Sequence, residues 1–281
     1  MKYLLSISAV LLPLLCSAGS VAADSADYDA DPYFILSQEA DSAIARRDWP
    51  VAAARLSDAI AVRPDAPTNM LLLTNLATVY ACLGHDSLSL ATYARVLDKA
   101  PSMLTTRLAR GRQLLRMGRD ADAYADFTQA VAIDSLSTEA RYYRGMIALY
   151  GGDATQAEAD FLTLARIAPK SHDAAVALGT LYSLTGRERM AIPYLERVIE
   201  AEPAPEYYAS LAGCRLAMGE LSEASEIIAL GLKRYPDDPE LYYYRAWLNR
   251  DRFHLDQAHK DARRAVELGA SEDKVRRLFG E

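Results

Sequence analysis

Glycine recurs along this chain at a nearly fixed step, and this period constrains the fold more than any other feature of the sequence. Five glycines carry a spacing of 34, 34, 34 and 33 residues: Gly84, Gly118, Gly152, Gly186 and Gly219. Alanines keep the same phase five residues later: Ala123, Ala157, Ala191, Ala224 and Ala258. A period of this length means that one supersecondary unit is copied and stacked. The sequence therefore predicts one elongated domain of repeated units.

Each unit has the composition of two helices joined by a turn. Apolar residues at three- and four-residue spacing precede each glycine, as in 76–83, and predict a helix with one buried face. The glycine adopts the left-handed conformation that ends a helix. An acid such as Asp86 or Asp153 is placed to cap the second helix. Proline, as at Pro169, ends that helix because it has no N–H.

This pattern resembles that of the tetratricopeptide repeat (TPR) family. The fourth unit carries it most completely, with Gly145, Gly152, Ala157, Phe161 and Pro169. The resemblance implies an all-α fold, a right-handed α-solenoid of about seven helix-turn-helix repeats with a short C-terminal capping helix. The expected repeats cover 33–272 and are 33–66, 70–103, 104–137, 138–171, 172–204, 205–238 and 239–272.

The end of the chain is expected to close the stack. A helix near Ser271 to Phe279 has Val275, Leu278 and Phe279 at helical spacing, and residues 273–281 are assigned to the cap. The last repeat departs from the pattern, with Phe253 in place of the turn glycine. Terminal units of a solenoid are commonly atypical.

The N-terminus has the layout of a secretory signal. One lysine precedes an apolar run that ends at Cys16, and small residues follow up to Ala23. We therefore expect residues 1–23 to be removed, residues 24–32 to form an acidic linker, and the mature protein to be periplasmic or associated with the envelope. As an alternative, Cys16 would be lipidated and would anchor an assembly subunit of an envelope complex. The Leu14–Leu15 pair before it does not suit that processing.

The sequence offers no candidate for catalysis, for a cofactor or for a metal. The four histidines, His85, His172, His254 and His259, do not pair at metal-ligand spacing. We find neither a phosphate-binding loop nor a nucleophile elbow. The net charge of −7 does not favour nucleic acid or an anionic membrane as a partner. An enzyme remains the third hypothesis, which a bound cofactor in purified protein would revive.

Arginine and aspartate occur together in three of the units. Each arginine lies eight residues before the turn position and each aspartate eight after it: Arg110 and Asp126, Arg144 and Asp160, Arg245 and Asp261. A helical hairpin brings such symmetric positions together. We expect three structural salt bridges within units. The alternative is a basic contact for an acidic ligand.

In the TPR family the first helices of the repeats line a concave groove that binds peptide segments. Carried over to this sequence, the groove candidates are Leu108, Arg112, Leu115, Arg116, Tyr142, Met146, Tyr150, Tyr243 and Trp247. Aromatic and arginine side chains are typical of binding hot spots. Met146 and Trp247 are equally compatible with the core between helices. The family variety that grips a carboxylate uses Lys and Asn where this chain has Asp41, Thr78, Arg112 and Met146.

The sequence thus favours a non-enzymatic scaffold of the cell envelope that binds a protein or an extended peptide on its concave surface. The identity of that partner is not encoded in a recognisable motif. No cofactor is expected, and a membrane contact is expected only if Cys16 is lipidated.

Overall fold

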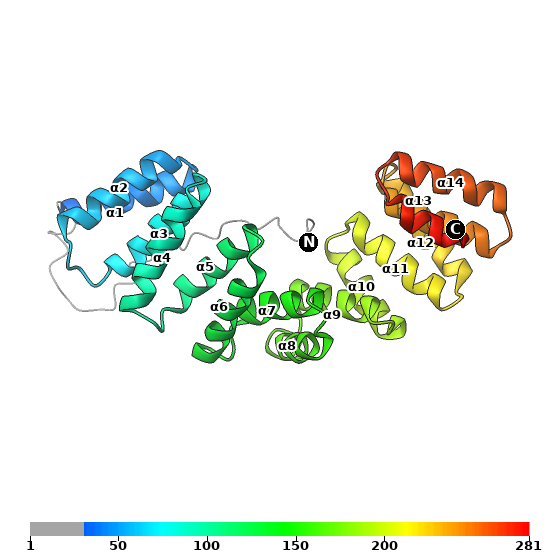
Figure 1. Cartoon of the computed structure of the whole chain (residues 1–281), viewed down its shortest axis with the longest axis horizontal. Coiled ribbons are helices and arrows are strands. Elements are labelled where there is room, and N and C mark those ends of the chain that lie inside the picture. The colour runs from blue at the N-terminus through cyan, green and yellow to red at the C-terminus, as the bar shows by residue number, and fades with distance from the viewer. Residues whose placement is uncertain (1–30, 281) are drawn as a thin grey trace. The chain divides into compact units, whose positions relative to one another are not determined.

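The computed structural model describes residues 31–280, which form 15 α-helices and no strand (Figure 1). In chain order the helices are α1 Pro32–Ala45, α2 Trp49–Val62, α3 Asn69–Cys82, α4 Asp86–Lys99, α5 Leu104–Arg116, α6 Asp120–Ile133, α7 Thr138–Tyr150, α8 Ala154–Ile167, α9 His172–Leu184, α10 Glu188–Ala201, α11 Pro205–Ala217, α12 Leu221–Arg234, α13 Pro239–Asp251, α14 Leu255–Glu267 and α15 Glu272–Phe279. The all-α prediction is confirmed.

The expected signal segment 1–23 lies outside the described residues, as does most of the expected linker 24–32. The structure corrects the end of that linker, because α1 already begins at Pro32. The Asp31 carboxylate accepts a hydrogen bond from the Tyr33 amide at 3.0 Å, and proline suits the first helical position.

The helices form two compact units, one ending at Ile147 and one beginning at Ala148. In the first unit, α1 packs with α2, α3 with α4, and α5 with α6, so that helices adjacent in sequence form hairpins. In the second unit, α9 packs with α10, α11 with α12, and α13 with α14. Each hairpin also contacts the next one along its unit, which is how a solenoid buries the apolar face of every helix.

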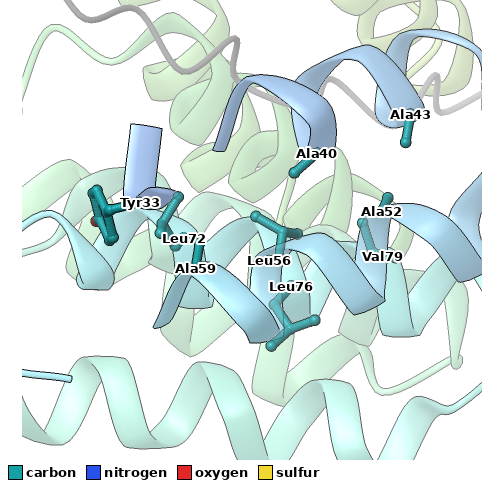
Figure 2. Close-up of a cluster of buried hydrophobic side chains, with 9 residues drawn as sticks. All are labelled: Tyr33, Ala40, Ala43, Ala52, Leu56, Ala59, Leu72, Leu76 and Val79. Carbon is teal, nitrogen blue, oxygen red and sulfur yellow. The ribbon is translucent and has the colours of Figure 1, made fainter. Parts of the chain in front are cut away.

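The first two hairpins show how small and large residues share the core (Figure 2). Ala40 and Ala43 of α1 and Ala52 of α2 are completely buried, and an alanine leaves room for close helix approach. Leu56 of α2 and Leu72 of α3 fill the space beside them. This alternation of small and large side chains gives a close-packed interior.

The turns between paired helices need a left-handed residue. The five periodic glycines have φ between +68° and +90° there. In the first and last hairpins the same position holds Arg47, with φ of 58°, and Phe253, with φ of 61°. A residue with a Cβ is strained in this region, so these two turns are less favourable than the glycine turns.

The C-terminal helix covers the last hairpin, as the sequence predicted. Val275 and Leu278 of α15 are buried against Ala262 and Ala265 of α14, and Phe279 is partly buried beside them. Gly280 then ends the helix in a left-handed conformation, with φ of 79°.

Candidate functional site

The first unit contains a pocket between α3 and α5, the first helices of two successive hairpins. Its volume is about 40 Å³, enough for roughly three water molecules or for the end of one side chain. The lining residues come from α3, α4 and α5: Thr78, Ala81, Cys82, Tyr93, Ala109, Arg112, Gln113 and Arg116. Two of the predicted groove residues, Arg112 and Arg116, therefore lie in one pocket.

Hydroxyl groups join the helices around this pocket. Thr74 and Thr106 meet through their hydroxyls at 2.7 Å and so join α3 to α5. Thr78 donates to the Thr74 carbonyl at 3.0 Å, which leaves its oxygen to accept from the Tyr93 hydroxyl at 2.7 Å. Burial raises the pKa of Tyr93 to about 12, an effect that the positive charge of Arg112 only partly offsets. Tyr93 is therefore a neutral donor fixed against Thr78.

The two arginines are held in different ways. Arg112 forms an ion pair with Glu139 of α7, and only 14% of its side chain is exposed. Arg116 donates to the Ala81 carbonyl at 3.2 Å and to Gln113, and it lies 3.9 Å from Asp86. The Ala81 carbonyl is in the last turn of α3, where carbonyls have no partner within the helix. Arg116 therefore stabilises that helix end at the edge of the pocket.

A thiol and an amide complete the lining. Burial raises the pKa of Cys82, although the positive charge of Arg116 opposes this, so the thiol stays protonated at neutral pH. The Gln113 amide donates to Asp86. With arginine N–H groups and an amide placed around a small opening, the pocket is suited to a carbonyl or carboxylate oxygen of a ligand.

The other groove candidates of α5 and α7 differ in exposure. Leu108 and Met146 keep only 9% and 4% of their surface and belong to the core. Leu115 is partly buried in the cluster around Phe127. Tyr142 is half-buried, and Tyr150 is 46% exposed. Of these five residues, Tyr150 offers the most surface to a ligand.

Tyr243 and Trp247 of α13 pack against the capping helix, and for Trp247 this is the core alternative that the sequence analysis left open. Both are partly buried against the C-terminal helix α15. The Lys274 ammonium of α15 lies 4.2 Å from the centre of the Tyr243 ring, and Arg250 donates to the Leu278 carbonyl at 2.6 Å. These side chains form the seat of the capping helix.

The Arg–Asp pairs link the two helices of a hairpin. Arg110 donates to Asp126 with two bonds of 2.7 and 2.6 Å. Arg245 does the same to Asp261 at 3.0 and 2.6 Å. The side chains of the two acids are only 4% and 2% exposed. The pair Arg144–Asp160 has one residue in each compact unit and stays a prediction.

The hydroxyl of Tyr93 was the feature of the pocket that sequence reasoning missed. This position holds the large residue that follows the small one, and Phe127, Phe161, Leu195 and Ile228 occupy it in other units. Tyrosine there adds a polar group to an otherwise apolar position, and this was the one signal available. That its hydroxyl meets Thr78 depends on the packing of α3 on α4.

Within residues 31–280 no group of three or more histidine, cysteine, aspartate or glutamate side chains could hold a metal ion. In the same range, no helix combines the length and the apolar composition needed to cross a membrane. Cys82 and Cys214 are both free thiols.

Family models and solved structures both relate this chain to tetratricopeptide repeat proteins. Tetratricopeptide repeat models match residues 37–103, 108–172, 172–205 and 191–248. A solved TPR protein from Parabacteroides merdae is 22% identical, with a TM-score of 0.64 over 88% of this chain and 97% of its own. PilW, a type IV pilus biogenesis factor, is 21% identical, with a TM-score of 0.64 over 78% of this chain and 98% of its own. YrrB, a TPR protein with an unusual peptide-binding site, is 17% identical, with a TM-score of 0.56 over 67% of this chain and 98% of its own.

A curated relative is the FK506-binding protein-like protein of Mus musculus, 31% identical over 88 residues. The match covers 31% of this chain, which spans only a quarter (25%) of that protein's length. The family models together cover most of the chain, and the helical hairpins described above have the architecture they imply. The chain belongs to the tetratricopeptide repeat family.

Proposed function

We propose that this protein is a non-enzymatic scaffold that binds a protein or an extended peptide on the surface formed by the first helices of its repeats. The observation that carries the proposal is the pocket between α3 and α5, where Arg112, Gln113 and Arg116 surround a small opening. The peptide-binding site of YrrB supports the same use of a related fold.

The pocket would act on a peptide through its oxygen atoms. An arginine has five N–H donors, and the ion pair with Glu139 uses only the Nη1 atom of Arg112. Because its side chain is 14% exposed, a further bond from this guanidinium would form in a largely water-excluded place. A backbone carbonyl or an acidic side chain is the group that fits. The bond between Tyr93 and Thr78 holds these two lining side chains in place, so they need little further ordering on binding.

The test is affinity purification from native cells with covalent cross-linking, followed by identification of the cross-linked peptides. The informative variant is Arg112→Gln with Arg116→Gln, which removes both charges and keeps the side-chain length similar. The matched control is Arg95→Gln with Lys99→Gln, two exposed cations of the neighbouring helix α4. We expect the first variant to lose cross-links to α3 and α5 while the control keeps them. Equal cross-linking by both variants would contradict the proposal.

We also propose that the protein is exported and works in the cell envelope. The support is the charged start, the apolar run and the small residues of segment 1–23. N-terminal sequencing of native protein should begin at Asp24, and a start at Met1 would contradict export. Labelled palmitate on Cys16 would instead favour the lipid-anchored alternative.

A further inference from the structure

The second compact unit contains a larger pocket, which lies between α12 and α13. Its volume is about 440 Å³, within the range of ligand pockets in proteins. Ile228 and Leu232 of α12 and Leu248 of α13 give it an apolar wall, while Lys233, Tyr242 and Arg245 supply polar and charged groups. From this lining we infer a second binding site, for an acidic peptide segment of a partner protein in which a carboxylate stands beside an apolar side chain.

One cation that lines this pocket, Arg245, is fixed before any ligand arrives. Arg245 gives its Nε and Nη2 atoms to Asp261, and its guanidinium lies 4.8 Å from the centre of the Tyr242 ring. These bonds leave the Nη1 atom without a role in the pair. The Arg245 side chain is still 36% exposed. A guanidinium held in this way loses little freedom when it binds a second carboxylate.

The surrounding charges favour an anion. Lys233 is exposed, and no ion pair involving it occurs within residues 31–280. Arg252 reaches the Ser225 end of the pocket, where its Nη1 atom lies 3.4 Å from the Ser225 hydroxyl. Of the nearby acids, Asp261 is buried under Arg245, and Asp237 pairs with Arg264 at 3.1 Å. The local balance is therefore positive in a chain whose net charge is −7.

Comparison with the first unit shows that this pocket lacks a carboxylate. In both units one position of the preceding second helix lies twelve residues before the paired arginine, and it holds Asp98 before Arg110 but Lys233 before Arg245. Asp98 is close enough to help raise the pKa of Arg110, after the larger effect of Asp126. The pocket between α12 and α13 has a lysine in place of that carboxylate. An acidic side chain from a partner would restore the charge pattern.

The apolar wall restricts the kind of anion. Ile228 is buried, while Leu232 is only partly buried and so leaves apolar surface in the pocket. A peptide that carries leucine beside aspartate would cover this surface and would bring its carboxylate to Lys233 and Arg245. A bare inorganic anion would use the charges and leave the wall exposed to water.

The test measures the fluorescence anisotropy of a labelled pentapeptide of alternating leucine and aspartate with blocked ends. The variant is Lys233→Glu, because Lys233 is exposed and its replacement leaves the Arg245–Asp261 pair intact. The control is Lys260→Glu, an exposed lysine of α14 outside the pocket. We expect Lys233→Glu to weaken binding by about tenfold or more, through the loss of attraction and the new repulsion, and Lys260→Glu to leave it unchanged. The counterpart peptide with asparagine should bind the native protein more weakly than the aspartate peptide does.

The inference would be overturned if the aspartate peptide did not bind to the native protein. Equal binding by the two lysine variants, or equal binding of the aspartate and asparagine peptides, would also overturn it. The site is separate from the one proposed between α3 and α5, so Arg112→Gln with Arg116→Gln should bind the pentapeptide normally. If that double variant loses the pentapeptide while Lys233→Glu retains it, the inference is wrong and the peptide reports the other pocket.

Discussion

Replacing Asp126 with alanine should destabilise the first unit strongly. The carboxylate is 4% exposed and accepts two bonds from Arg110, and the Arg107 Nη1 atom lies 3.5 Å away. Asp126→Ala removes the acceptor and leaves the arginine in place. The change therefore creates an unpaired charge between α5 and α6, which are held together at this point by the pair.

The magnitude follows from burial. Breaking a buried ion pair by removing one partner costs roughly 3–5 kcal/mol. The Arg110 side chain is 26% exposed and regains some hydration in the variant. We therefore expect the free energy of unfolding to fall by about 3 kcal/mol, the lower end of that range. Asp122→Ala is the matched control on the same helix. Its 54% exposed carboxylate pairs with Arg119 at 2.6 Å on the surface. Such a pair contributes less than about 1 kcal/mol.

The assay is urea unfolding followed by circular dichroism. With a slope of about 3 kcal/mol per molar urea for a chain of this size, Asp126→Ala should lower the midpoint by roughly 1 M. Because repeat proteins can unfold in stages, hydrogen exchange should also show the loss of protection in α5 and α6. A midpoint shift for Asp126→Ala no larger than that for Asp122→Ala would refute the argument that the buried pair, rather than helix content, is responsible.

Three further predictions follow from other residues. Folding raises the pKa of Tyr93 from 10.0 to about 12, so the folded state holds this proton more tightly than the unfolded state does. The free energy of unfolding is therefore unaffected below about pH 10 and falls between the two pKa values by roughly 1.4 kcal/mol per pH unit. Tyr93→Phe should flatten that fall in urea titrations at alkaline pH, and an unchanged slope would contradict this prediction. Gly111→Ala would place a Cβ 2.7 Å from the Phe127 ring and should cost about 1 kcal/mol net, even though alanine favours helix; Phe127→Leu added to it should recover stability, and a stabilised single variant would show that the ring moves freely. Phe253→Gly should raise the thermal midpoint by relieving strain of about 1 kcal/mol at φ of 61°, since the side chain is 86% exposed and little burial is lost; a lowered midpoint would point to a contact of that ring.

The fold could be predicted from the sequence because the same local pattern of turn glycine and small alanine recurs in successive repeats. Each glycine at a turn and each alanine between helices has a steric role that depends only on its own unit, so Gly84 and Ala123 could be placed without a structure. The Arg110–Asp126 contact was also predictable, since a hairpin turn fixes which positions face each other. The cap followed from the spacing of Val275 and Leu278.

The start of the first helix was predicted less accurately from the sequence. The linker was expected to reach residue 32, but the Asp31 cap starts α1 at Pro32. Capping is decided by one hydrogen bond, and a periodic pattern does not resolve a single residue at its edge.

The candidate sites depended on contacts between units, which periodicity does not encode. Periodicity selects the face of a helix, but it does not say how much of that face the next hairpin covers. Thus Leu108 and Met146 became core, and Trp247 became part of the seat of α15, while Arg112 and Arg116 remained at a pocket. The sequence by itself determined the repeated hairpin, because its forces are local. The tertiary structure decided which side chains remain open to a partner, because exposure depends on neighbours that are far away in the chain.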